Sequence, residues 1–242
     1  MGRFLVLGAT GKTGRLAVRE LTRRGHGVTA VVRNKKTLAD LGLNKVKQLE
    51  GTILDSFTDE QVQDMVSDAD AVLICLGHVL SFSGIFFPPR RLVLDTLKKV
   101  ASAMDGGKKK KRIVLMNSNG VRNKSTGEVY PLAERILTGL LYFTLPPHAD
   151  NVEAAEYLIN EVGEHANVEW CCVRPGDLLD GHENEDYEVV GSVDPSKGVV
   201  LGPWKTSRFQ VAHFMASLGE GGKVWEDWKF RTPVIYSPAL GA

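Results

Sequence analysis

Short apolar segments alternate with amphipathic segments along most of the 242-residue chain. The apolar runs are rich in valine, isoleucine and leucine, and turn residues bound them, which is typical of β-strands. Continuous apolar runs indicate strands covered on both faces, and the intervening helices indicate parallel crossovers. The pattern predicts an α/β fold, a Rossmann-type doubly wound parallel sheet of about seven strands with helices on both faces. The predicted strands are Phe4–Leu7, Val28–Val32, Val46–Leu49, Ala71–Leu76, Ile113–Met116, Val168–Val173 and Val234–Tyr236.

The first helix is the clearest of the helices that the pattern predicts. Its arginines face away from its small and apolar residues, and Gly25 follows at the position of a C-cap. The face expected to pack on the sheet consists of Gly14, Ala17, Val18 and Leu21. Further helices are predicted at Thr58–Ser67, Arg90–Met104, Asn151–Val162 and Ser207–Leu218. No linker or internal repeat divides the chain, so we expect one domain over residues 1–242.

The overall charge is close to balanced, with 30 Lys and Arg against 29 Asp and Glu. This balance argues against a nucleic-acid or anionic-membrane partner and favours a small-molecule substrate. We interpret the basic run Lys108–Arg112 as a solvated loop rather than a polyanion-binding patch. The apolar stretch Ile136–Leu145 is too short to span a bilayer. The three cysteines lack disulfide or zinc spacing, so we expect reduced thiols, no metal site and a cytoplasmic location.

A glycine-rich turn follows the first predicted strand directly and opens the first helix. Its residues are Gly8, Ala9, Thr10, Gly11, Lys12, Thr13 and Gly14. The first glycine suits a tight turn, the second lets the backbone approach a pyrophosphate, and the third permits close helix packing. The helix N-terminus presents free N–H groups to the phosphates. This is a dinucleotide-binding signature, although its first glycine spacing is one residue wider than usual.

The end of the second strand indicates which dinucleotide is bound. Arg33 stands where an NAD-binding protein places a carboxylate on the ribose 2′-hydroxyl. An arginine there suits a 2′-phosphate, so NADP(H) is the expected cofactor. The alternative is a surface charge at a strand end. Lys12, Thr13 and Arg15 are further candidates for phosphate contacts, with solvated side chains as the alternative for Lys12 and Arg15.

With these features the chain resembles an atypical short-chain dehydrogenase/reductase, in the group of NAD(P)H-binding proteins that includes NmrA-like proteins and the biliverdin reductase B/flavin reductase type. The ordered set of matching segments spans nearly the whole chain. It comprises Leu5–Gly14, Val31–Asn34, Gly51 with Asp55, Asp70–Gly77, Val114–Ser118, Val173–Gly176, and Ser207 and Arg208 before Val211 and Ala212.

The resemblance implies a strand order of 3-2-1-4-5-6-7, with the cofactor along the carboxyl ends of the strands. It places Ile53, Leu54 and Asp55 near the adenine. It places Cys75, Leu76, Gly77 and His78 near the ribose and pyrophosphate, and Pro175, Gly176 and Leu178 near the nicotinamide. Asn117 and Ser118 complete the implied cofactor-binding set. Strand-end packing and turns are the alternative roles for these residues.

The chain departs from the wider superfamily in its catalytic residues. Familiar members use a Tyr-x-x-x-Lys pair, in which the lysine lowers the pKa of the phenol so that it exchanges a proton with a carbonyl. Here Tyr130, Tyr142 and Tyr157 are followed four residues later by Glu134, Pro146 and Glu161. The usual proton-transfer pair is therefore missing.

Two kinds of function fit this departure. One is an NADPH-dependent reductase that acts by positioning a flavin, quinone or other conjugated or carbonyl acceptor for hydride transfer. The candidate catalytic residues are then Ser118, His148 and Tyr142, with a turn hydroxyl, a surface histidine and a core tyrosine as the alternatives. The other is a non-catalytic NADP(H) sensor of NmrA-like type that binds a protein partner. A nucleotide-sugar epimerase or dehydratase is disfavoured because it depends on the missing pair. The apolar segments Ser81–Arg91 and Val129–Pro147 are expected to wall the substrate pocket.

Overall fold

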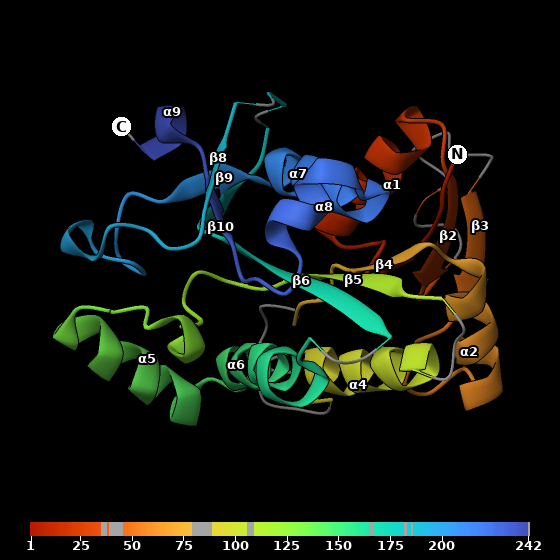
Figure 1. The fold of residues 1–242 in the computed structure, drawn as a ribbon, viewed down its shortest axis with the longest axis horizontal. Coiled ribbons are helices and arrows are strands. Elements are labelled where there is room, and N and C mark those ends of the chain that lie inside the picture. Colours follow the sequence, from red (N-terminus) through yellow and green to blue (C-terminus); the bar gives the residue numbers. More distant parts are fainter. Residues whose placement is uncertain are drawn as a thin grey trace.

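All seven predicted strands form and belong to one sheet in the computed structural model (Figure 1). The structure describes residues 1–34, 38, 46–78, 89–105, 109–164, 167–181, 183–184 and 186–241. The seven strands are β1 (Arg3–Leu7), β2 (Gly27–Val32), β3 (Val46–Glu50), β4 (Ala71–Ile74), β5 (Lys111–Met116), β6 (Val168–Pro175) and β10 (Val234–Tyr236). They lie in the order β3-β2-β1-β4-β5-β6-β10, and every neighbouring pair is parallel. This order confirms the predicted doubly wound sheet.

Three short strands were not predicted. β8 (Glu188–Val190) extends the sheet by pairing antiparallel with β10, so the sheet has eight strands. β7 (Asp177–Leu179) and β9 (Lys205–Ser207) form a separate parallel pair. Each has three residues: β7 and β8 combine one acidic residue with two apolar residues, and β9 consists of Lys205, Thr206 and Ser207. None of them has the long apolar run that marks a core strand. They form only because other parts of the fold offer a strand to pair with, so the local pattern did not predict them.

Helices cover both faces of the sheet (Figure 1). One face carries α1 (Lys12–Arg23), α7 (Arg208–Glu220) and α8 (Gly222–Trp228). The other carries α2 (Asp59–Asp68), α4 (Leu92–Asp105) and α6 (Pro146–Glu156). Alternate strand residues feed the two cores: Val6 belongs to the first and Leu5 to the second. The sheet is thus buried on both faces, as continuous apolar strands require.

The first helix has the predicted apolar face. Ala17, Val18 and Leu21 are fully buried, and Gly14 lies with them against the sheet. Gly25 adopts φ 83° just beyond the helix, a left-handed conformation that glycine adopts without strain.

Two helical segments differ from the prediction. α6 begins at Pro146 rather than Asn151, because two prolines fit a first helical turn, where no N–H partner is needed. It continues as a π-helical segment, η3 (Tyr157–Val162). α5 (Leu132–Thr144) was not predicted, and only Glu134 of its side chains is buried. The remaining short helices are η2 (Lys124–Thr126), η4 (Pro195–Lys197) and α9 (Pro238–Gly241).

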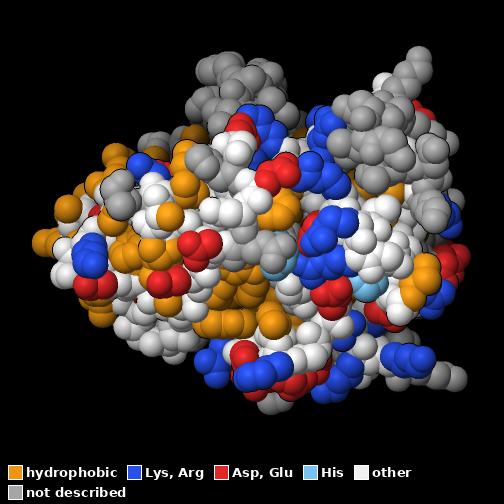
Figure 2. All heavy atoms as spheres, turned by 90° about the horizontal axis from the view of Figure 1, so that it is seen from above, with side chains coloured by type: hydrophobic (Ala, Val, Ile, Leu, Met, Phe, Trp, Pro, Cys, Tyr) orange, Lys and Arg blue, Asp and Glu red, His pale blue; other side chains and the backbone are white. Residues whose placement is uncertain are grey.

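Charges of both signs are mixed on the surface. Figure 2 shows one face of the molecule, turned by 90° from the view of Figure 1. On this face hydrophobic side chains gather toward the left, and Lys and Arg lie beside Asp and Glu toward the centre and right. In the basic run, Lys108 lies outside the described residues, and Lys111 donates from Nζ to the carbonyls of Ser67 and Ala69 at the C-terminal end of α2. Within the described parts of the chain, no helix combines the length and the apolar character needed to cross a bilayer.

Candidate functional site

A cavity of about 360 Å³ opens at the carboxyl ends of β1, β2 and β4. The parallel register creates it, because Leu7 pairs with both Val31 and Ile74, which brings the three strand ends level. The cavity lies where ligands bind in open α/β sheets. Its described lining is Leu7, Gly8, Thr10, Gly11, Val31, Arg33, Gly51, Thr52, Ile53, Leu54, Asp55, Cys75, Leu76, Gly77, His78, Pro89, Leu92 and Thr96.

The glycine turn forms one wall of the cavity, and its close packing needs glycine. Gly8 has φ 74°, and a Cβ there would lie 2.5 Å from the carbonyl oxygen of Cys75. A Cβ on Gly14 would lie 2.1 Å from the carbonyl oxygen of Gly8. Gly11 is the N-cap of α1 and has no side chain to accept from the helix N–H groups. The helix N-terminus is thus left for an anion.

The glycine turn has three polar residues, Thr10, Lys12 and Thr13. Only Thr10 belongs to the described cavity lining. Thr13 is buried at 4% exposure, inside the first turn of α1. Lys12 is not part of the described cavity lining, and its Nζ lies 2.8 Å from Oδ2 of Asp180. Arg208 contacts Oδ1 of the same carboxylate at 2.6 Å. The two cations, Lys12 first, lower the pKa of Asp180.

Arg33 and the loop after β3 meet at the other end of the cavity. Val32 pairs with Glu50, and Gly51 N–H donates to the Val32 carbonyl at 2.8 Å. This places the exposed Arg33 side chain on the same cavity as Ile53, Leu54 and Asp55. The loop is closed by Thr52, whose Oγ1 donates to Oδ2 of Asp55 at 3.0 Å.

Residues 75 to 78 line the cavity from the end of β4. Burial raises the pKa of Cys75 to about 12, so its thiol stays protonated at neutral pH. His78 follows, with Nε2 2.8 Å from Oδ2 of Asp150 on α6. Both side chains are nearly inaccessible, at 4% and 0% exposure. Asp150 also accepts from the N–H groups of Val93 and Leu94 at 2.8 and 2.9 Å, so it caps the first turn of α4.

Two of the candidate catalytic residues, Ser118 just after β5 and His148 in α6, both lie near Gly120. A Cβ on Gly120 would lie 3.5 Å from Oγ of Ser118 and 3.6 Å from Cε1 of His148. Asn117 ties this region to α6, because its Nδ2 donates to the Asn151 carbonyl at 2.9 Å. Burial lowers the pKa of His148, and a backbone hydrogen bond with Thr138 acts in the opposite direction with a smaller effect.

Tyr142 lies apart from these residues on α5. Its hydroxyl donates to Oε1 of Glu153 at 3.1 Å, and this hydrogen bond raises the pKa of the phenol. The apolar side chains of the same helix point outward, with Phe143 85% exposed. In the segment expected to wall a pocket, residues 81–88 lie outside the described residues, and Pro89 lines the cavity.

The turn after β6 packs closely and lies outside the described cavity lining. A Cβ on Gly176 would lie 1.9 Å from the Trp204 carbonyl oxygen, so glycine is needed there for packing. Pro175 accepts from the Asn119 N–H at 3.0 Å, next to Ser118. Leu178 is in β7, partly buried against the core, and its carbonyl accepts from Arg208.

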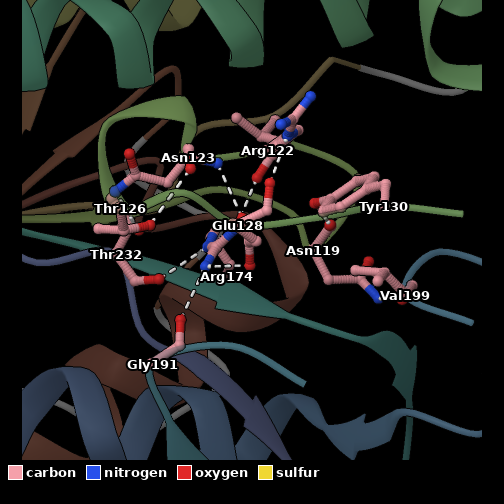
Figure 3. Close-up of polar contacts among 12 residues, drawn as sticks. Asn119, Arg122, Asn123, Thr126, Glu128, Tyr130, Arg174, Gly191, Val199 and Thr232 are labelled. Atoms are coloured by element: carbon pink, nitrogen blue, oxygen red, sulfur yellow. Dashed lines mark hydrogen bonds and ion pairs between the residues drawn. The ribbon is translucent and has the colours of Figure 1, made fainter. Parts of the chain in front are cut away.

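A buried ion pair supports the loop that carries Ser118 (Figure 3). Arg174 contacts both carboxylate oxygens of Glu128, at 2.7 and 3.1 Å, with both side chains almost fully buried. The same guanidinium donates to the carbonyls of Val121, Thr232 and Gly191. The pair therefore joins β6, the loop after β5 and the chain around β8 and β10.

Sequence reasoning missed Asp150, the carboxylate partner of His78. The two residues are 72 positions apart, and no local spacing connects them. The only available signal was a lone acid immediately before a predicted helix, and such an acid is more often a solvated residue.

Comparison with known proteins agrees with this geometry. A family model described as NAD(P)H-binding matches residues 8–220. A short-chain dehydrogenase/reductase from Veillonella parvula, solved with NADP, superimposes with a TM-score of 0.69 at 15% identity, covering 100% of this chain and 97% of that chain. The anaerobillin reductase ChuY from Escherichia coli O157:H7 superimposes with a TM-score of 0.65 at 17% identity, covering 98% of each chain.

A protein from Lactobacillus casei gives a TM-score of 0.71 at 20% identity, with 97% and 99% of the two chains covered. At these identities the likeness to solved structures concerns the fold. Among curated proteins, no sequence match is found.

Proposed function

Because this chain belongs to the NAD(P)H-binding family, we propose that it is an NADPH-dependent reductase that transfers a hydride to a small conjugated or carbonyl acceptor. The observation that carries the proposal is the cavity, in which an uncapped helix N-terminus, a glycine turn and Arg33 face one space. The glycine turn fits the cofactor because Gly8 and Gly14 carry no side chains. A side chain at either position would collide with backbone atoms of the turn or of Cys75 and would displace the cavity wall.

Each part of the cavity suits one part of the cofactor. Gly8, Thr10 and Gly11 would hold the pyrophosphate with the N–H groups of α1. Arg33 would hold the 2′-phosphate, which favours NADPH over NADH. Ile53, Leu54 and Asp55 would contact the adenine, and residues 75–78 a ribose. When bound, the cofactor supplies a hydride from its dihydronicotinamide ring.

The nicotinamide and acceptor are assigned to the neighbouring strand ends. Ser118 and His148 lie together there, close to Pro175 through the Asn119 hydrogen bond. Ser118 would donate a hydrogen bond to the acceptor or the nicotinamide ribose. Pro175, Gly176 and Leu178 would border the ring, with Asn117 holding the start of α6 in place. Lys12 would contact phosphate only after releasing Asp180.

A fluorescence titration with NADPH and NADH tests the cofactor. We expect tighter binding of NADPH, and Arg33→Ala should weaken NADPH by about tenfold or more while leaving NADH nearly unchanged, because a charge-assisted phosphate contact is lost. Arg19→Ala is the matched control, since Arg19 pairs with Glu183 away from the cavity. Tighter binding of NADH would contradict the assignment.

A second candidate, a non-catalytic NADP(H) sensor that binds a protein partner, is favoured by the missing tyrosine–lysine pair and by the exposed apolar side chains of α5. Its exposed members are Leu132, Ile136, Leu140 and Phe143. Turnover separates the two functions. A reductase consumes NADPH with FMN, menadione or a simple aldehyde, whereas a sensor binds NADPH tightly and consumes none.

A further inference from the structure

Half of the large hydrophobic side chains that are exposed in the described part of the chain belong to α5. Leu132, Ile136, Leu140 and Phe143 are 70%, 65%, 59% and 85% exposed. Their spacing places them on one face of the helix, and the buried Glu134 lies on the opposite face. These four side chains, called the α5 face below, are therefore turned away from the body of the protein.

Polar contacts fasten α5 to the body, so the α5 face is a preformed surface. The Glu134 carboxylate accepts from the backbone N–H groups of residues 199–201 at 2.9 to 3.1 Å. Near the other end of the helix, the Tyr142 hydroxyl donates to Glu153 on α6 at 3.1 Å. Figure 1 shows α5 beside α6, the helix on which it mainly packs. A partner that binds the α5 face meets an ordered helix, which lowers the entropic cost of association.

The spacing of the four apolar side chains is nearly the same when the helix is read in either direction. Ile136 and Leu140 stand two residues before and after Thr138. Leu132 stands six residues before that point, and Phe143 stands five residues after it. When two copies of α5 lie antiparallel around this point, Ile136 faces Leu140 of the second copy, and Leu132 faces Phe143. A two-fold dimer requires a self-complementary face of this kind.

The area of the α5 face fits the apolar part of a dimer interface. Its four side chains offer on the order of 500 Å² of apolar surface, at roughly 150–250 Å² for each large side chain when fully exposed. A standard interface takes about 800 Å² from each partner, and about 65% of a homodimer interface is apolar. The α5 face alone therefore supplies about the apolar area that each partner of a stable homodimer buries.

The charges of α5 favour a second copy over a membrane surface. The helix has one cation, Arg135, and its one acid, Glu134, is buried. A helix that lies on a membrane typically carries several Lys and Arg on its polar face. In an antiparallel pair, the two Arg135 residues lie about 9 Å apart along the helix axis, at about 1.5 Å per residue. Like charges are therefore kept away from the centre of the pair.

We propose that α5 is the dimerisation surface of this protein and that two copies pack their α5 faces antiparallel around a two-fold axis. The α5 face lies outside the described lining of the cavity, so the proposal does not depend on the reductase function. It also gives the exposed apolar side chains of α5 an occupant other than the protein partner of a sensor.

Sedimentation velocity on the full chain tests the oligomeric state. The wild type should sediment as a dimer, and Leu140→Glu should raise the dimer Kd by about 100-fold or more, because each dimer would bury two unpaired carboxylates near its axis. Val224→Glu is the matched control, since Val224 is an exposed apolar residue of α8. It should leave the dimer Kd nearly unchanged. Far-UV circular dichroism checks that both variants are folded.

Disulfide cross-linking tests the antiparallel direction. Ile136→Cys chains are mixed with ¹⁵N-labelled Leu140→Cys chains and oxidised with copper phenanthroline, so that the mixed disulfide has its own mass. The native cysteines are buried and should contribute little. We expect the mixed disulfide to exceed its statistical share, because residue 136 faces residue 140 of the second copy. A product dominated by the Leu140→Cys homodimer would show a parallel pair and overturn the proposed direction.

Three further outcomes overturn the proposal. A wild type that stays monomeric at about 100 µM has no stable dimer, since an interface of this size should associate in the micromolar range or below. A Leu140→Glu variant that dimerises as tightly as the wild type places the interface on another face. Flotation of a monomeric wild type with phosphatidylserine vesicles, lost in Leu140→Glu, assigns α5 to a membrane surface.

Discussion

Gly14 packs so closely on Gly8 that a Cβ on Gly14 would lie 2.1 Å from the Gly8 carbonyl oxygen. The contact couples the first turn of α1 to the turn that lines the cavity. Gly14→Ala must therefore displace the cavity wall. We expect a loss of about 1–3 kcal/mol in the free energy of unfolding, measured in urea, together with weaker NADPH binding.

Gly139→Ala is the control for that change. Gly139 is also helical, but a Cβ there meets nothing within 4 Å. Alanine favours a helix over glycine by about 1 kcal/mol, so this variant should be neutral or slightly stabilised. Equal effects of the two substitutions would show that the close approach at Gly14 has no special importance.

The free energy of unfolding should also depend on the buried ion pair between Arg174 and Glu128. Glu128→Gln keeps the shape of the side chain but leaves a buried guanidinium without its counter-charge. Breaking a buried pair on one side costs about 3–5 kcal/mol, which chemical denaturation would measure. Lys124→Met removes the exposed pair with Glu156 and should cost less than about 1 kcal/mol. Similar losses in both variants would argue that burial of the first pair is unimportant.

Stability at acidic pH should depend on Glu20. Its carboxylate accepts from Arg23 and Arg24, and these contacts, chiefly with Arg23, lower its pKa from 4.5 to about 2. Because the folded pKa lies below the unfolded value, the contribution is present above pH 4.5 and is lost as the pH falls toward 2. Glu20→Gln should cost about 1.5–3 kcal/mol at pH 7 and should flatten the acid limb of a stability profile.

Glu183→Gln is the surface counterpart of that variant, since it removes the exposed pair with Arg19. It should leave both the stability at pH 7 and the acid limb nearly unchanged. An unaltered acid limb in Glu20→Gln would show that another carboxylate dominates acid unfolding.

Thiol reactivity should be low despite the position of Cys75 on the cavity. Burial raises the pKa of Cys75 and of Cys172 to about 12 and raises that of Cys171 as well, so little thiolate exists at neutral pH. Iodoacetamide at pH 7 should label the native protein slowly and the urea-unfolded protein at all three cysteines, as mass spectrometry would show. Rapid native labelling at Cys75 would indicate that the cavity wall opens.

Local sequence patterns determined most of the sheet. The seven apolar runs became strands, and the glycine turn joins β1 to α1 as its spacing indicated. The order of these strands in the sheet is the one that the family resemblance implied. Such patterns succeed because strand burial and tight turns depend on residues close in sequence. β8 was missed for the opposite reason: it exists only because β10 offers an edge to pair with.

Within the candidate site, the sequence by itself determined the glycine turn and the position of Arg33 after the second strand. Only the tertiary structure decided that Lys12 pairs with Asp180 and that His78 pairs with Asp150. These partners are far apart in the chain, so no periodicity records their contact. Packing of α6 against α4 and of the segment after β7 against α1 brings the charges together, and that packing is a property of the whole fold.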